Sequence, residues 1–229
     1  MIDFLISKLT KIYKELQASD FLKNLTSFYS GYQKKIDVLG KKLAKQGINA
    51  NMVSIFGFII GIMAVNFLAM NMYFEALICI LTNRFCDLLD GAVARHEGPT
   101  SFGIFLDAGL DFIFYAGVIF GFSLADPEEN AVSACFLLFS FTASATTMLA
   151  YGIVAHKTEK YDFALKQSPF YLGGLAQGFE TTTAFVLLCI MPFAFLPISI
   201  ILGCWCLVKA LVIISSAYYQ LVISNKSKQ

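Results

Sequence analysis

Apolar residues in this chain form long continuous runs, and short polar stretches separate these runs. No charged residue occurs at the 29 positions between Lys45 and Glu75. A run of about 20 apolar residues is long enough to cross the hydrocarbon core of a bilayer as a helix. The pattern predicts six transmembrane helices, with the expected ranges Met52–Met70, Tyr73–Ala94, Phe102–Ala125, Ala131–Ala155, Leu175–Met191 and Leu196–Leu221.

The composition agrees with an all-α integral membrane protein. Hydrophobic residues make up 57% of the 229 residues, and charged residues make up 14%. A soluble domain usually carries about 25% charged residues. These values exclude a disordered chain and an ordinary soluble enzyme.

Basic residues fall in every second loop, and this bias predicts the orientation in the membrane. Nine lysines precede the first predicted span, whereas the turns at Asn71, Asp126–Asn130 and Pro192–Pro197 have no lysine or arginine. The pattern predicts an even number of spans with both termini in the cytosol. The other basic loops and the tail hold Arg95, then Lys157, Lys160 and Lys166, and finally Lys226 and Lys228.

Residues 1–50 are expected to form a basic amphipathic segment ahead of a membrane domain over residues 51–225. Nine lysines and four acidic residues occur in residues 1–51. The segment is interpreted either as helices on an anionic leaflet or as a cytosolic helical hairpin. Gly31 is the expected break between two helices. Because the basic residues directly precede a long apolar run, no nucleic-acid partner is expected.

Charged residues also occur inside the second and third predicted spans and in the turn between them. A charge at mid-membrane costs about 2.5–3.5 kcal/mol even on lenient scales. These side chains are therefore expected to face one another, a metal or a watery cavity rather than lipid. They are Arg84, Asp87, Asp90, Arg95, Asp107 and Asp111.

The spacing of the four aspartates indicates which helix faces they share. Asp87 and Asp90 are three residues apart, and Asp107 and Asp111 are four apart, so each pair lies on one side of a helix. Two antiparallel helices would bring the pairs together, and four carboxylates repel one another unless cations neutralise them. Hard oxygen ligands select Mg²⁺, Mn²⁺ or Ca²⁺. Arg95 nearby would suit a phosphate.

The same residues form a recognisable signature. The segment resembles that of the CDP-alcohol phosphotransferases, integral membrane enzymes of phospholipid synthesis, although seven residues stand where the family usually has eight before the second glycine. The start of the first span resembles the family's Pro-Asn-x-x-Thr-x-x-Gly, with Ala50 for the proline and Ser54 for the threonine. The two segments read Asp87-x-x-Asp90-Gly91-x-x-Ala94-Arg95-x₇-Gly103-x-x-x-Asp107-x-x-x-Asp111 and Asn51-Met-Val-Ser54-Ile-Phe-Gly57.

This resemblance implies a six-helix fold, a homodimer, and a polar site open to the cytosol. Such enzymes move a phosphatidyl group from CDP-diacylglycerol to an alcohol and release CMP. The acceptors considered are glycerol 3-phosphate, an inositol phosphate, inositol and serine. The size and the compact signature are more typical of bacterial members, so the bacterial inner membrane is the expected location.

The resemblance also implies residue roles. One or two Mg²⁺ or Mn²⁺ ions would be held by the four aspartates, and a two-metal site is expected. Asp111 would in addition take the proton from the attacking hydroxyl. The CDP pocket would be lined by Gly91, Ala94 and Arg95, together with Asn51 and Ser54 of the first span.

Other interpretations of the charged cluster stay open at this point. The same chemistry with the pairing reversed would use a CDP-alcohol and diacylglycerol. The aspartates could belong to an ion transporter, to a structural ion-pair network with Arg84 and Arg95 as partners, or to a non-catalytic homologue. A transporter would spread its acids over several helices, whereas these are concentrated on two.

Two further charges lie in the fifth and sixth predicted spans. Lys209 is about twelve residues from the end of the sixth, roughly 18 Å along a helix, which is too far to reach the interface easily. It either meets a phosphate or ester of a ligand or pairs with Glu75 or Glu180. Glu180 follows a glycine-rich stretch and either shapes an alcohol pocket or is an exposed acid at a helix start.

Overall fold

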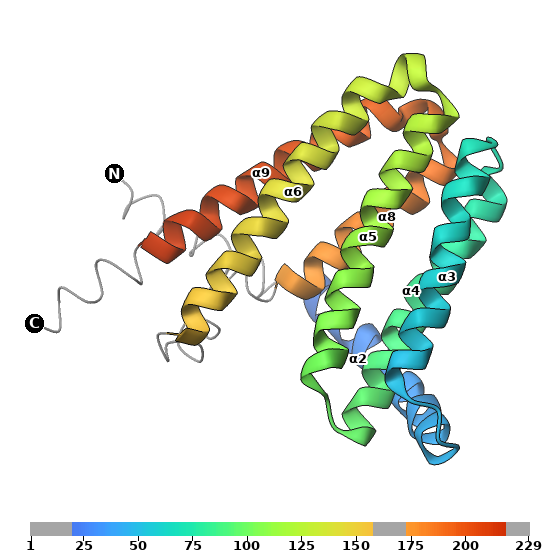
Figure 1. Cartoon of the computed structure of the whole chain (residues 1–229), viewed down its shortest axis with the longest axis vertical. Helices are drawn as coiled ribbons and strands as arrows, with labels where there is room; N and C mark the ends of the chain where they lie inside the picture. Colours follow the sequence, from blue (N-terminus) through green and yellow to red (C-terminus); the bar gives the residue numbers. More distant parts are fainter. Residues whose placement is uncertain (1–19, 158–172, 219–229) are drawn as a thin grey trace, which may run out of the picture. The chain divides into compact units, whose positions relative to one another are not determined.

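A computed structural model describes residues 20–157 and 173–218, and the regular secondary structure of these residues is all helical (Figure 1). The expected all-α class is confirmed for this part of the chain. The helices are α2 (Asp20–Lys45), α3 (Ala50–Ala69), α4 (Tyr73–Glu97), α5 (Ser101–Ala125), α6 (Pro127–Lys157), α8 (Gly173–Ile190), the 3₁₀ turn η1 (Pro192–Ala194) and α9 (Phe195–Tyr218).

Each of the six predicted spans corresponds to one helix from α3 to α9, with ends that differ by a few residues. Four of the described helices are long and apolar enough to cross a membrane, which indicates a multi-pass membrane protein. They cover Ala50–Ala69, Ser101–Ala125, Pro127–Val154 and Pro192–Ser215.

The two remaining predicted spans, α4 and α8, have a different character. Helix α4 is 25 residues long but carries the charged cluster, and the apolar part of α8 is the shorter stretch Glu180–Ile190. Length and composition therefore support four spans directly, and the count of six stays a prediction.

The chain divides into two compact units, and α3, α4 and α5 each continue from one unit into the other. The first unit consists of Met1–Gly57 and Phe85–Leu110. The second consists of Phe58–Arg84 and Asp111–Gln229.

Helix α2 packs closely against α4 within the first unit. A Cβ atom on Gly40 would lie 2.6 Å from the Cβ of Ala92, so only glycine permits this approach of the two helices. Ile36 of α2 is buried in a small apolar cluster that also contains Val53 and Leu89. One side of α2 therefore packs against other helices of the protein.

The expected break at Gly31 is wrong, because α2 runs as one helix from Asp20 to Lys45. A single glycine lowers helix stability by about 1 kcal/mol, which the rest of a 26-residue helix tolerates. The expected helix over the first residues of the chain falls outside the described residues.

The second unit holds the main apolar core. Helices α6 and α9 run side by side in it (Figure 1), and Gly203 of α9 gives room to the Phe136 ring of α6. Large side chains from different helices are fully buried there, including Leu68, Phe114 and Phe185. This core holds the first part of α4 and the later part of α5.

Candidate active site

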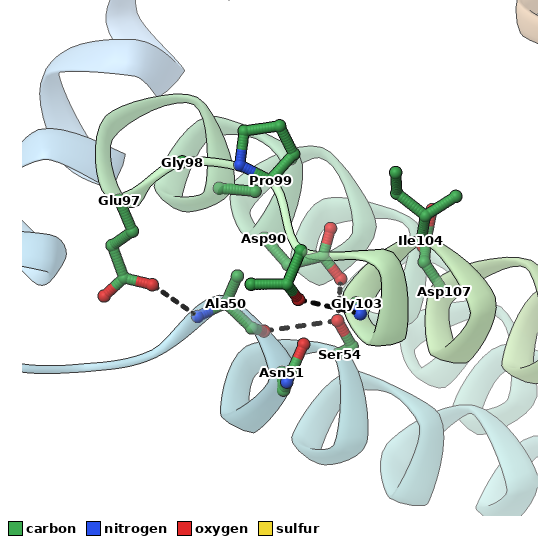
Figure 2. Close-up of a pocket in the computed structure, with 13 residues that line it drawn as sticks. Ala50, Asn51, Ser54, Asp90, Glu97, Gly98, Pro99, Gly103, Ile104 and Asp107 are labelled. Atoms are coloured by element: carbon green, nitrogen blue, oxygen red, sulfur yellow. Dashed lines mark hydrogen bonds between the residues drawn. The ribbon is translucent and has the colours of Figure 1, made fainter.

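A cavity of about 210 Å³ opens in the first unit (Figure 2). It lies among the start of α3, the end of α4 and the start of α5. Most of the residues that the signature predicts to bind the nucleotide line it, and so do two of the four aspartates. The lining residues are Ala50, Asn51, Ser54, Asp90, Gly91, Ala94, Glu97, Gly98, Pro99, Thr100, Gly103, Ile104 and Asp107.

Asp90 is the buried carboxylate of this cavity, with 6% of its surface exposed. The Ser54 hydroxyl donates a hydrogen bond of 2.5 Å to Asp90 Oδ2 (Figure 2). Burial of a carboxylate is costly unless hydrogen bonds replace its lost hydration. Ser54 therefore holds Asp90 in one orientation, with its hydroxyl in the position of the family's threonine.

The turn between α4 and α5 shows how the seven-residue spacing is accommodated. Gly98 has a φ of +93°, which favours glycine, and its N–H bonds to the Ala94 carbonyl at 2.9 Å. Thr100 then caps α5, because its hydroxyl oxygen accepts the Gly103 N–H at 3.0 Å. A tight glycine turn followed directly by a capped helix closes the shorter connection.

Gly103 lies where α5 approaches α3 closely. A Cβ atom at this position would lie 3.0 Å from Thr100 Oγ1 and 3.1 Å from Asn51 Oδ1. Such contacts would push the cap and the Asn51 amide outward. The second glycine of the signature therefore keeps the Asn51 side of the cavity open.

Glu97 compensates for the absence of the family's proline at the start of α3. Ala50 has an N–H that a proline would lack, and this group donates to Glu97 Oε2 at 3.4 Å (Figure 2). The next N–H, of Asn51, is capped by Asn49 Oδ1 at 2.8 Å. Side chains thus satisfy two of the free N–H groups at this helix end.

Asp87 and Asp107 present carboxylate oxygens within 4.8 Å of each other. Asp87 is half-buried and Asp107 is exposed. These are hard oxygen donors at a spacing that a divalent cation can bridge, so the residues present fit Mg²⁺ or Mn²⁺. Helix α5 continues without a break to Asp111, which follows Asp107 by about one helical turn.

Arg95 lies at the end of α4 and is not among the residues that line the cavity. It forms an ion pair of 2.6 Å with Asp37 of α2, and both side chains are about half exposed. The backbone carbonyl of Asp37 also contacts His96 Nε2 at 3.2 Å. The place of Arg95 in a nucleotide pocket stays a prediction, since a ligand phosphate would compete with Asp37.

Asp111 lies in the second unit, where Arg84 of α4 holds it. The guanidinium donates to Asp111 Oδ1 at 2.6 Å and to Oδ2 at 3.4 Å. It also donates to the Tyr115 hydroxyl at 2.6 Å. Arg84 therefore forms an ion pair with an aspartate of the signature, whereas Arg95 forms one with Asp37 of α2.

Lys209 of α9 pairs with Glu180 of α8 in the second unit. Trp205 donates its indole N–H to the same carboxylate oxygen, Oε2, at 2.9 Å. Of the alternatives for Lys209, the described contacts match the pairing with Glu180.

Several residues of these networks have no counterpart among the sequence-predicted site residues, and Asp37, Thr100 and Tyr115 are examples. Thr100 had a usable signal, because a threonine three residues before a helical glycine is a cap candidate. Asp37 and Tyr115 gave none, since their partners are 58 and 31 positions away in the chain.

The fold and the site together define a multi-pass helical membrane protein with clustered carboxylates beside a cavity. The sequence pattern of the CDP-alcohol phosphatidyltransferases matches residues 48–217. This match covers most of the chain and contains both helices of the signature. The chain belongs to the CDP-alcohol phosphatidyltransferase family, a family of transferases.

Two known proteins are similar to the chain. The chain is 43% identical to the inner membrane protein YnjF of Escherichia coli K12 over 181 residues, which is 78% of this chain and 87% of YnjF. It is 34% identical to the archaetidylinositol phosphate synthase of Pyrococcus horikoshii over 110 residues, 48% of this chain and 58% of that one. No solved structure matches the chain significantly.

Proposed function

We propose that this protein transfers a phosphatidyl group from CDP-diacylglycerol to the hydroxyl of a small acceptor and releases CMP. The observation that carries the proposal is the pairing of Asp87 with Asp107 beside a cavity that Asp90 also lines. These carboxylates stand at the positions of the family signature. The proposal assigns phospholipid synthesis as the biological role.

Asp87, Asp90, Asp107 and Asp111 are proposed to hold one or two Mg²⁺ or Mn²⁺ ions. Bound there, a divalent cation would neutralise the pyrophosphate of the donor and the negative charge that develops on the CMP leaving group. The protein contributes the orientation of the ligands: Ser54 fixes Asp90, and the helical spacing places Asp111 after Asp107 on α5.

The cytidine nucleotide is proposed to occupy the cavity of the first unit. Asn51 and Ser54 of α3 offer polar groups there, whereas Gly91 and Ala94 of α4 leave space. Arg95 would join the pocket by exchanging Asp37 for a ligand phosphate. The starts of α3 and α5 at the cavity also carry the partial positive charge of a helix N-terminus, which favours an anionic ligand.

Asp111 is proposed to accept the proton of the attacking hydroxyl. The acceptor oxygen forms a bond to the phosphorus that carries the diacylglycerol, and the bond from this phosphorus to the CMP oxygen breaks. The proton passes from the acceptor hydroxyl to the Asp111 carboxylate. A positioned base contributes about 10²–10⁴-fold to such a step.

The proposal includes six membrane spans, with both termini in the cytosol and a location in a bacterial inner membrane. Residues 1–50 would form the basic amphipathic segment, and residues 51–225 the membrane domain. A homodimer is proposed as the working unit. The support for this arrangement comes from the basic loops, the four apolar helices and the similarity to an inner membrane protein.

Purified protein in lipid nanodiscs should be assayed for CMP release with CDP-diacylglycerol and each acceptor in turn. The panel is glycerol 3-phosphate, inositol 1-phosphate, inositol and serine. An inositol phosphate is included because one relative is named an archaetidylinositol phosphate synthase. We expect one acceptor to give CMP together with a lipid product.

A parallel arm supplies CDP-choline or CDP-ethanolamine with diacylglycerol. CMP release in this arm alone would replace the proposed pairing with the reversed one. Silence in both arms, with no binding of cytidine nucleotides to folded protein, would contradict the proposed function and favour a transporter.

A further inference from the structure

The guanidinium of Arg84 has an acceptor for every one of its N–H groups. An arginine side chain carries five such donors in a rigid planar fork. Three of the bonds fix the guanidinium beside Asn83 and Tyr115, and two of them reach the two oxygens of Asp111. The bonds are Nε and Nη2 to Asn83 Oδ1 at 2.9 and 2.6 Å, Nη2 to Asp111 Oδ1 at 2.6 Å, and Nη1 to Asp111 Oδ2 at 3.4 Å and to Tyr115 Oη at 2.6 Å.

The surroundings keep this guanidinium in place. The Arg84 side chain is only 11% exposed, and its central carbon lies 4.7 Å from the ring centre of Phe114 and 4.9 Å from that of Tyr115. Gly61 of α3 makes room for the network, since a Cβ atom there would come within 2.8 Å of both Asn83 and Phe114. Packing as well as hydrogen bonds therefore fixes the orientation of the Arg84 guanidinium.

We propose that Arg84 is a positioning residue that fixes the plane of the Asp111 carboxylate for proton transfer. The inference rests on the proposed function of Asp111 as the base. Arg84 stands outside the family signature, three residues before Asp87. Because its donors are already committed to protein acceptors, Arg84 acts through Asp111 and not as a phosphate ligand.

Two consequences follow from this geometry. A two-oxygen contact prevents rotation of the carboxylate, and loss of alignment in a reacting group can lower a rate about 10²-fold. The fixed positive charge also competes with a divalent cation for Asp111. Removal of Arg84 should therefore slow turnover while it tightens the binding of the cation.

The test compares Arg84→Gln and Arg84→Lys in the full-length protein. Binding of Mn²⁺ alone is measured by electron paramagnetic resonance, without substrates. Arg84→Gln should bind Mn²⁺ about fivefold more tightly than the wild type and release CMP with a kcat about 10²-fold lower. Arg84→Lys keeps the charge but not the fork, so it should show near wild-type Mn²⁺ affinity with a lowered kcat.

The same substitution in an Asp111→Asn background separates positioning from a general structural role. If Arg84 acts through Asp111, Arg84→Gln should leave the Mn²⁺ affinity of Asp111→Asn unchanged. A matched control removes another half-buried ion pair of the second unit, with Glu180→Gln and Lys209→Gln together. This control should retain the wild-type Mn²⁺ affinity.

The inference is overturned if Arg84→Gln and Arg84→Lys both keep the wild-type kcat. It is equally overturned if Arg84→Gln alters Mn²⁺ affinity to the same extent with Asn at position 111. Where Arg84→Gln fails to fold, Arg84→Lys and Tyr115→Phe supply the kcat comparison. Absence of CMP release by the wild-type protein would instead contradict the proposed function. The Mn²⁺ affinities of the wild type, the two single variants and the double variant would still show whether Arg84 and Asp111 are coupled.

Discussion

At the scale of single residues, two aspartates of the site are each oriented by a neighbouring side chain. Ser54 holds Asp90 in the first unit, and Arg84 holds Asp111 in the second. Loss of a neighbour that orients a metal ligand typically costs about 10–100-fold in metal affinity or activity. The effect of each neighbour can be measured by removing only its hydrogen-bonding group.

Ser54→Ala should lower kcat/KM for CDP-diacylglycerol by about tenfold. The change removes the donor to Asp90 Oδ2 and leaves this buried carboxylate free to rotate. Ser54→Thr keeps the hydroxyl at the position where the family has threonine, so it should retain most of the activity. Equal rates for the alanine variant and the wild type would show that Asp90 needs no such support.

Helical spacing alone places Asp87 beside Asp90 and Asp107 beside Asp111, so the sequence offers these aspartates as candidates, and their roles stay a prediction. It left the partners of the two arginines undetermined. Arg95 pairs with Asp37, 58 positions away, and this choice depends on how closely α2 approaches α4 at Gly40. Such a contact is set by packing between helices, which local periodicity does not encode.

At the scale of elements, the ends of the helices shape the cavity more than their interiors do. The start of α3 uses Asn49 and Glu97 to satisfy its free N–H groups. The connection to α5 uses Gly98 and Thr100. The turn is one residue shorter than is usual in the family, and the glycine turn and the cap absorb this difference. The aspartates of α4 and α5 therefore keep their positions on the helix faces.

Ala50→Pro should raise the stability by about 0.4–1 kcal/mol. Ala50 is the first residue of α3, where proline fits, and its N–H makes only the 3.4 Å contact with Glu97. Asn51→Pro is the matched control, because it removes the N–H that Asn49 caps at 2.8 Å. Thermal unfolding in detergent should give a higher Tm for the first variant and a lower Tm for the second; similar losses in both would contradict the account.

Lys209→Met should destabilise the contact of α8 with α9 by about 3 kcal/mol. The change leaves the Glu180 carboxylate, which is 33% exposed, without its cation. Adding Glu180→Gln should restore most of the stability, because the amide oxygen can still accept the Trp205 N–H. A double variant less stable than Lys209→Met, as judged by Tm in detergent, would show that the charge pair itself stabilises the fold.

At the scale of the whole molecule, the sequence predicts where the helices lie along the chain. It predicts only in part which of these helices cross the membrane. The apolar runs located all six helices from α3 to α9, because continuous apolar runs have few alternatives to buried or lipid-facing helices. Helix α4 carries six charged residues, so composition alone does not place it across the bilayer. That α4 crosses the bilayer is a prediction from the alternation of basic loops.

Reporter fusions at the turn between α5 and α6 distinguish six spans from four. With six spans, a fusion at Asp126–Asn130 lies outside the cytosol, and alkaline phosphatase is active there. With only the four most apolar helices crossing, the same turn lies in the cytosol, and green fluorescent protein is fluorescent there. We expect the first result, together with a fluorescent fusion at Gln229; fluorescence at the turn would contradict the six-span topology.

The most direct test of the account is CMP release by protein that has been stripped of metal with EDTA. With CDP-diacylglycerol and its acceptor, the stripped protein should be inactive, and Mg²⁺ or Mn²⁺ should restore the rate. Asp111→Asn should bind nucleotide but stay at least about 10²-fold slower after metal is returned. Full activity in EDTA, or wild-type rates for Asp111→Asn, would contradict the proposed site.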